Sequence, residues 1–314
     1  MLSSIKFIFS SLALSLFAAS SLCFASYIEG DVVASDTGVP RYMNPSGGTA
    51  ITPKSYIIGY NSSDGSHTLT GGVPMVGYGD NYVQLIIRDG WSVDANTSGK
   101  IGDNGSENCL MYIEGEGSEY DVPGYAWGLH GSNNTMVITD GARMNVKDIS
   151  SDSDASNSSI TVKNNGIFEA EERFDFSDGS DTSFIIGEAG TLMIGDSSTS
   201  FVDVTGTNNT LELIDSSNGT LAVYGDQSDL FDFDGSNDIT NFYVDGSLTS
   251  AGNPVSYDYF ATSGDATSAG FASMFGGYTV IGAPVAPIPE PSSSILLLLA
   301  VCGILQKRNH KVVL

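Results

Sequence analysis

The sequence predicts an all-β protein whose body is a parallel β-solenoid, in which short strands stack turn upon turn around one core. Pairs of short apolar strands separated by a glycine-containing turn recur at a step of roughly 25 residues, within the range typical of solenoids. The strands are rich in Ile, Val, Leu, Phe, Tyr and Thr, and Gly, Asn, Asp and Ser bound them. Glycine is abundant, with 37 residues, while charged residues make up only 16%. This composition is typical of turn-dense β structure and unlike that of a disordered chain.

The clearest copy of the repeat is Ser183–Asp196, where two apolar strands flank a turn at Gly190. The other copies are Ser55–Thr70, Val83–Asn96, Cys109–Val122, Thr135–Asp148, Ser159–Glu172, Thr210–Asp226 and Ile239–Ser250. One copy buries too few side chains to be stable alone, so about eight turns are expected to stack and share a core. A β-sandwich or jelly roll is the alternative, because it also has short strands at regular spacing.

The segments outside the repeats predict a chain with several parts. We expect a signal peptide at 1–25, an N-terminal cap at 26–54, solenoid repeats at 55–250, a C-terminal cap at 251–282, a proline-rich linker at 283–291 and an apolar segment with a basic tail at 292–314. The caps are expected because the terminal turns of a solenoid must shield an open end.

The N-terminus has the pattern of a secretory signal. Lys6 supplies positive charge, and Ile5–Phe17 is a mostly apolar, helix-forming run. Cys23 and Ala25 place small residues three and one positions before a cleavage point, so we expect the Sec machinery to export the chain and cleavage between Ala25 and Ser26.

The C-terminal segment predicts an anchor. Ile295–Leu305 is an apolar run of eleven residues, shorter than the ~20 residues of a full membrane span. Counting Ser292–Ser294 and a snorkelling Lys307, a transmembrane helix just reaches across the inner membrane. Lys307 and Arg308 would hold the C-terminus in the cytoplasm. The body is therefore expected outside the inner membrane, in the cell envelope, on the surface or released.

Pro289, Glu290 and Pro291, followed by the apolar run and a basic end, resemble the PEP-CTERM sorting signal of Gram-negative bacteria. The resemblance covers about a tenth of the chain, which also continues to Leu314 beyond a modest basic cluster. It implies processing by an exosortase, a membrane-embedded transpeptidase-like enzyme, and export to the cell surface or extracellular polymer matrix. The repetitive body is similar to the β-solenoids of autotransporters and pectate-lyase-like proteins.

The formal net charge is −25, with 12 Lys and Arg against 37 Asp and Glu. This balance argues against nucleic acid and anionic lipid as partners, since both need a basic surface. The acidic residues have two interpretations. They keep the open edges of a long sheet soluble, or acidic turns such as Asp152–Asp154 and Asp232–Gly235 bind Ca²⁺. No other cofactor or metal is expected.

Catalytic signals are weak. Histidine is limited to His67, His130 and His310, and the chain lacks the common metal, nucleotide and nucleophile motifs. Gly128–Gly131 only partly matches the Gly-His-Gly of polygalacturonases. Arg88, Arg143 and Arg173 lie in or near repeats, where they form either a stripe on one face or separate salt bridges.

The three cysteines give no disulfide framework, because Cys23 and Cys302 lie in the terminal apolar segments. Cys109 is therefore expected to be a buried thiol. The least regular stretch, Asp121–Ser132, contains Tyr125 and Trp127. It is either a packed loop or an inserted carbohydrate-stacking patch.

These observations favour an exported, non-enzymatic component of the cell surface or biofilm matrix, with structural or adhesive function. The alternatives are a polysaccharide lyase or hydrolase on the same fold and a carbohydrate-binding module that uses Trp91, Trp127 and nearby tyrosines. Extracellular polysaccharide is the partner expected beside the Sec machinery and the exosortase.

Overall fold

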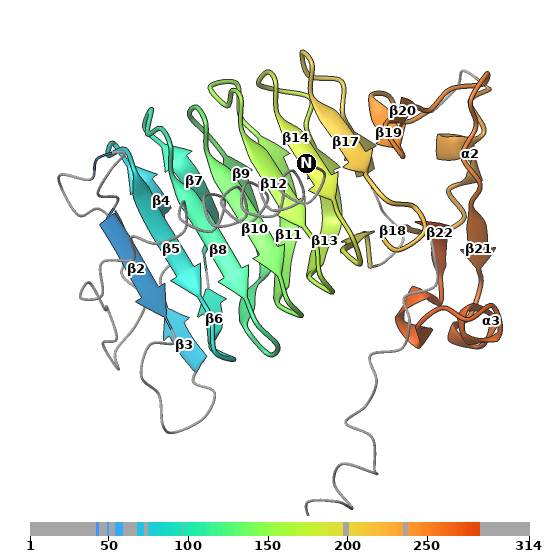
Figure 1. Ribbon diagram of the computed structural model, residues 1–314, viewed down its shortest axis with the longest axis horizontal. Helices are drawn as coiled ribbons and strands as arrows, with labels where there is room; N and C mark the ends of the chain where they lie inside the picture. Colours follow the sequence, from blue (N-terminus) through green and yellow to red (C-terminus); the bar gives the residue numbers. More distant parts are fainter. Residues whose placement is uncertain are drawn as a thin grey trace, which may run out of the picture.

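A computed structural model describes residues 42–43, 49, 54–58, 68–71, 75–95, 97–196, 201–234 and 238–282 of the 314-residue chain. This part is all-β with a few short helices, and it forms a parallel β-solenoid of about six turns (Figure 1). The predicted all-β, parallel solenoid body is thus confirmed for these residues, and the sandwich alternative is wrong because successive strands pair in parallel with the turn before and after. Figure 1 shows the strands side by side from β2, in blue, to β17, in yellow.

The described strands form two sheets. Sheet A contains β1 (Tyr42–Met43), β3 (Thr68–Gly71), β4 (Met75–Tyr78), β6 (Ser92–Ala95), β7 (Gly99–Asp103), β9 (Glu119–Leu129), β11 (Arg143–Ser151), β13 (Ile167–Asp175), β15 (Thr191–Ile194), β16 (Phe201–Asp203), β18 (Thr220–Tyr224), β21 (Asp258–Phe260) and β22 (Tyr278–Gly282). Sheet B contains β2 (Lys54–Ile58), β5 (Val83–Ile87), β8 (Leu110–Glu114), β10 (Thr135–Thr139), β12 (Ser159–Val162), β14 (Ser183–Ile186), β17 (Thr210–Leu213), β19 (Phe242–Val244) and β20 (Ser247–Leu248).

The strand register confirms the predicted repeat length. Leu110 pairs with Thr135, Thr135 with Ser159, Ser159 with Ser183, and Ser183 with Thr210, which gives a step of 24 to 27 residues. The described residues form about six turns, fewer than the eight expected. The first copy of the repeat is described only in part, and in the last copy β19 folds back on β20 as an antiparallel hairpin.

Each turn has three sides, because sheet A is bent. In the middle of the stack one long strand runs along both parts of the sheet, and the register shifts between Val146 and Asp148 where β11 bends. Nearer the ends of the stack the two parts of sheet A are separate strands. These are β6 and β7 towards the N-terminal end, and β15 and β16 towards the C-terminal end. The stretch Asp121–Ser132 belongs to this regular pattern, since most of it forms β9. The expectation that it is an irregular inserted loop is therefore wrong.

The core lies inside the three sides and is built from stacked rows of like side chains. Strands such as β12 and β14 alternate half-buried and buried positions, as the period of a strand requires. One row on sheet B consists of Ile87, Ile113, Ile138, Val162, Ile186 and Leu213, all fully buried. Stacking identical shapes about 4.8 Å apart fills the interior from one turn to the next.

The corner that enters sheet B is made by residues with positive φ. Asn108, Asn133, Asn157, Asp181 and Asn208 occupy the same place in successive turns, with φ between 48° and 58°. Asparagine and aspartate tolerate this conformation better than other residues with a side chain. Their side chains also bond along the stack, since the amide of Asn157 donates to Asn133 and that of Asn208 to Asp181. The sequence interpretation of asparagine as a turn residue is confirmed.

The C-terminal end changes direction. β22 pairs antiparallel with β18, and β21 pairs antiparallel with β22. β22 and β21 thus extend sheet A beyond β18 at the C-terminal end of the stack (Figure 1), and the segment with α3 (Ser263–Ser268) and the 3₁₀ helix η2 (Ser273–Phe275) packs on the outer face of these strands. A second apolar cluster forms there from Met193, Ala222, Phe260, Ala266, Phe271, Phe275, Tyr278 and Val280.

None of the helices in the described ranges is long and apolar enough to span a membrane. The expected signal peptide at 1–25 and the apolar segment at 292–314 lie outside these ranges, as do the linker at 283–291 and almost all of the expected N-terminal cap.

Candidate functional site

One candidate site lies where sheet A ends and the chain turns towards sheet B. Leu129 at the end of β9 pairs with Ser151 at the end of β11. The residues that follow, His130 and Asp152, therefore lie beside each other in neighbouring turns. Asp154, two residues further on, completes a group of three side chains whose nitrogen and oxygen atoms lie within 4.8 Å of one another.

The His130 imidazole faces both carboxylates. Its Nδ1 atom lies 3.3 Å from Oδ1 of Asp154 and 3.6 Å from Oδ2 of Asp152. The His130 side chain is only 10% exposed, whereas the two aspartates are about half exposed. The imidazole thus forms the inner wall of the group, and the carboxylates face the solvent.

Local hydrogen bonds fix this arrangement. The backbone N–H of His130 donates to the carbonyl of Ile101 at 2.9 Å, and the His130 carbonyl accepts from the buried Asn134 amide at 2.6 Å. Oδ1 of Asp152 accepts from the N–H of Ser153 at 2.6 Å and from its hydroxyl at 3.1 Å. This turn holds Asp152 so that its other oxygen, Oδ2, faces His130.

The surroundings of Asp152 favour its ionised form. Desolvation opposes ionisation of Asp152, but His130, the bonds from Ser153 and the more distant Lys100 outweigh it and lower the pKa of Asp152. Lys100 also lies 3.6 Å from Asp103 in the preceding turn. The group therefore combines one nitrogen ligand with two anionic oxygen ligands, a set that suits a divalent cation.

The second acidic turn predicted as a Ca²⁺ site, Asp232–Gly235, offers only oxygen atoms as ligands. The carboxylates of Asp232, Asp234 and Asp238 also approach within 4.8 Å of one another, while Gly235 lies outside the described residues. Among the described residues, no nitrogen or sulfur ligand joins this group, and Asp232 and Asp234 are exposed. Exposed acidic groups of this kind are common without a bound ion, so it carries no inference here.

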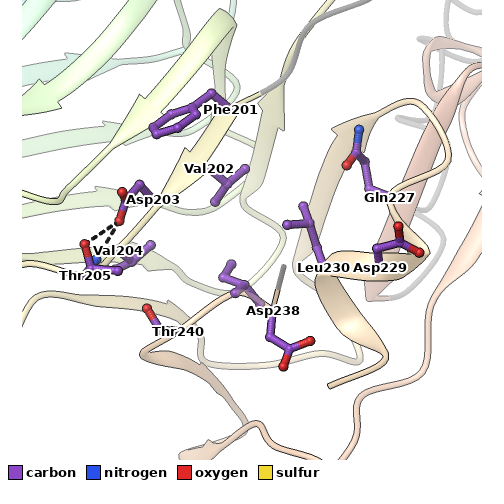
Figure 2. A pocket seen from close by; sticks show the side chains of 11 residues that line it. Phe201, Val202, Asp203, Val204, Thr205, Gln227, Asp229, Leu230, Asp238 and Thr240 are labelled. Carbon is purple, nitrogen blue, oxygen red and sulfur yellow. Dashed lines mark hydrogen bonds between the residues drawn. The ribbon is translucent and has the colours of Figure 1, made fainter. Parts of the chain in front are cut away.

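A cleft of about 410 Å³ lies between β16 and the short helix α2 (Ser228–Phe231). Figure 2 shows Phe201 and Asp203 on one wall, and Gln227, Asp229 and Leu230 on the other, with Asp238 below them. Its volume falls in the range of small-molecule sites.

The walls of this cleft are mixed in character. Phe201 is 44% exposed, and the guanidinium of Arg173 lies 4.9 Å from the centre of its ring. Oδ1 of Asp203 accepts from the N–H and the hydroxyl of Thr205 at 2.9 and 2.7 Å. An exposed aromatic ring beside carboxylates suits a hydroxyl-rich, uncharged ligand and repels an anionic one.

Trp127, predicted as a carbohydrate-stacking residue, is fully buried in the core. Its ring packs edge-on against Tyr120, with 5.1 Å between the ring centres. The stacking role is therefore wrong for Trp127, because an inward-facing position of β9 closes its ring off from any ligand. Trp91 is 9% exposed and belongs to the same core. Tyr125, by contrast, is 42% exposed.

The three arginines do not form a stripe. Arg88 follows β5 of sheet B, Arg143 begins β11 and Arg173 lies in the second part of β13, so they occupy three different sides of the solenoid. Each lies next to a carboxylate: Asp89 for Arg88, Glu169 for Arg143 and Asp175 for Arg173. The salt-bridge interpretation is the correct one.

Cys109 is a buried free thiol, as predicted. Burial raises its pKa to about 11, although nearby backbone N–H groups oppose the shift. The thiol is therefore protonated and poorly nucleophilic at neutral pH.

The remaining predicted site residues lie outside the described ranges. They are the cleavage pair Ala25 and Ser26, the motif Pro289, Glu290 and Pro291, and the flanks of the apolar segment Ile295, Leu305, Lys307 and Arg308. Comparison with known proteins adds no relative: no family model, no curated protein and no solved structure matches the chain.

Proposed function

We propose that this chain is an exported, non-enzymatic protein that serves as a structural or adhesive component of the cell surface or of an exopolysaccharide matrix. The observation that carries the proposal is the parallel solenoid with a continuous buried core. Such a stack is a stiff scaffold with a long lateral surface, which suits a protein that spans a distance outside the cell and displays binding surfaces along its length. The net charge of −25 supports a role in an aqueous, extracellular setting, where it keeps neighbouring molecules apart.

Export and sorting are part of the same proposal. The signal pattern that ends at Ala25 supports Sec-dependent export, and Pro289–Pro291 with the following apolar and basic residues supports sorting by an exosortase. In this scheme the tail anchors the chain in the inner membrane before the body reaches its final place.

The test is the intact mass of the mature chain from its native host, together with the cell fraction that contains it. The proposal expects a chain that starts near Ser26, ends near Pro289–Pro291 and is found outside the inner membrane. A chain that retains Leu314 in the inner membrane would reject processing of the tail and make it a permanent anchor.

A second candidate function is recognition of a neutral polysaccharide in the cleft between β16 and α2. The exposed ring of Phe201 is the feature that favours it, since sugars stack on aromatic faces while carboxylates such as Asp229 accept hydrogen bonds from hydroxyls. The cleft thereby takes the place of Trp127 as the carbohydrate-stacking position.

Glycan binding by Phe201→Ala and Asp229→Asn tests this role. Tyr259→Ala is the matched control, because Tyr259 is 44% exposed, as Phe201 is, but lies outside the residues that line the cleft. Loss of binding in the first two variants and retention in the control would support the cleft. Turnover of the glycan by the unmodified chain would instead favour a lyase or hydrolase and reject the non-enzymatic proposal.

A further inference from the structure

We propose that His130, Asp152 and Asp154 form a binding site for a divalent transition-metal ion of the Zn²⁺ class, held between two neighbouring turns of the solenoid. The site is independent of the cleft and of the proposed sorting signal. It rests on a buried imidazole that faces two carboxylates at the end of sheet A.

The distances from the His130 nitrogen to the two carboxylate oxygens match those between the ligands of one metal ion better than those of a hydrogen bond. Zn²⁺ with bonds of about 2.0–2.2 Å in a tetrahedron holds its ligand atoms roughly 3.3–3.6 Å apart. Nδ1 of His130 lies 3.3 Å from Oδ1 of Asp154 and 3.6 Å from Oδ2 of Asp152. Both distances exceed the usual ~2.7–3.2 Å of an N–H···O bond.

The protein holds the nitrogen ligand firmly and leaves the oxygen ligands adjustable. The His130 side chain is nine-tenths buried, and hydrogen bonds from Asn134 and to Ile101 fix its backbone on both sides. Asp154 lies on the exposed rim, where a small side-chain movement completes the coordination. An ion can therefore enter from solvent without any rearrangement of the core.

The ligand set decides which class of ion fits. Ca²⁺ takes six to eight oxygen ligands, whereas an imidazole nitrogen with two carboxylates suits Zn²⁺, Co²⁺ or Mn²⁺. His130 thus changes the sequence interpretation of the Asp152–Asp154 turn from a calcium site to a transition-metal site. A bound ion would also add a further link between these two neighbouring turns and so raise the stability of the stack.

Calorimetric titration of the full, chelator-treated chain in mild detergent tests the site, with Zn²⁺ and Ca²⁺ as probes. Asp154→Asn removes one ligand charge at an exposed position, and His130→Gln removes the nitrogen ligand. Asp215→Asn is the matched control, because Asp215 also accepts bonds from a nearby serine in an exposed turn but does not belong to the His130 group. We expect Asp154→Asn and His130→Gln to weaken Zn²⁺ binding at least ~10-fold and the control to leave it unchanged.

Nitrogen NMR of the histidine side chains gives a second readout that does not need a variant. Zn²⁺ should shift the His130 ring resonances at one equivalent, while Ca²⁺ should not. Equal Zn²⁺ affinity in the two ligand variants and the unmodified chain would overturn the proposal, as would an unshifted His130 ring. Zn²⁺ binding at His67 or His310 would persist in both variants and so would not imitate the expected loss.

Discussion

The middle of the solenoid and its C-terminal end solve the same packing problem in different ways. From β8 to β14 the chain repeats every 24 or 25 residues, strands pair only in parallel, and every inward side chain stacks on its equivalent in the next turn. Beyond β17 the step lengthens, β22 pairs antiparallel with β18, and a separate apolar cluster forms on the outer face of the sheet.

The difference shows that a stack of parallel strands needs a different structure at its end. The last turn has strand edges with unpaired backbone groups, and such an exposed edge can pair with other molecules. The chain ends the stack by reversing the last strands and by burying both faces of β15 and β18, whose residues Met193 and Ala222 point away from the core yet are covered. The centre therefore depends on repetition, whereas the end depends on specific contacts that occur once.

The largest expected effect lies in the central core. Phe184 is fully buried and contacts the rings of Phe168, Phe174 and Phe176, with ring centres 5.1 to 6.2 Å apart. Phe184→Ala should lower the free energy of unfolding by about 3–5 kcal/mol, because it leaves a cavity between two sheets. Urea denaturation measures the change. Phe201→Ala is the control, and a loss at Phe184 no larger than that of this exposed residue would contradict a shared central core.

A buried asparagine should give the next largest effect. The Asn134 side chain accepts from the N–H of Cys109 at 2.7 Å and donates to the carbonyls of His130 and Ser106 at 2.6 and 3.2 Å. Asn134→Ala leaves these three groups buried without their partner, so we expect a loss of about 2–4 kcal/mol in urea denaturation. Asn157→Gly in the exposed asparagine row keeps the positive φ and should be nearly neutral. Equal losses in the two variants would mean that the buried hydrogen bonds of Asn134 contribute no more to stability than the exposed asparagine row does.

A smaller, local effect is expected at the C-terminal end. The buried Tyr278 hydroxyl donates to the carbonyl of Gly195 at 2.7 Å and ties β22 to the turn after β15. Tyr278→Phe should lower local stability by about 1 kcal/mol. Amide hydrogen exchange should become faster in β21 and β22 and stay unchanged in β12. The exposed Tyr259→Phe is the control, and faster exchange throughout the stack would mean that end and centre unfold as one unit.

Periodicity predicted the centre of the fold well and its end poorly. The repeats around Ile138, Val162 and Ile186 are easy to recognise in the sequence. Each turn lies in the same environment, so the same pattern of buried and exposed residues recurs at a constant spacing. The reversal at β22 has no repeat to reveal it, since Tyr278–Gly282 has the composition of any other strand. Its direction depends on which edge is still open once the stack has formed.

The candidate sites show the same limit. The Asp152–Asp154 turn is visible in the sequence, but its contact with His130 is not, because that contact follows from strand register and not from proximity along the chain. The signal was present as a spacing of about one turn between His130 and Asp152. The burial of Trp127 is not predictable from composition, which does not reveal which face of β9 a residue occupies. Nothing in the sequence around Phe201 indicates a binding site, because the cleft exists only where α2 lies opposite β16 in the folded chain.

The smallest expected effect concerns the acidic outer face of the central turns. Burial raises the pKa of Asp121, and the charges of Asp94 and Glu169 raise it further, although the amide of Asn145 and Arg143 oppose the shift. Because its folded-state pKa is raised, Asp121 stabilises the fold fully only below the ordinary carboxyl pKa of about 4, and this contribution is lost as the pH rises through the raised value. Glu114, Glu119 and Asp148 shift in the same direction.

Asp121→Asn removes the charge but keeps an oxygen that can accept from Asn145. We expect a higher melting temperature at pH 7 and no gain near pH 4, with a stabilisation of at most about 1 kcal/mol, since solvent screens a half-exposed group. Asp215→Asn should give no such gain, because hydrogen bonds from Ser217 and Asn218 lower the pKa of Asp215 and make its charged form the favoured one. A lower melting temperature for Asp121→Asn at pH 7 would mean that the bond from Asn145 outweighs the repulsion. The acidic face would then stabilise the central turns and would not merely keep them soluble.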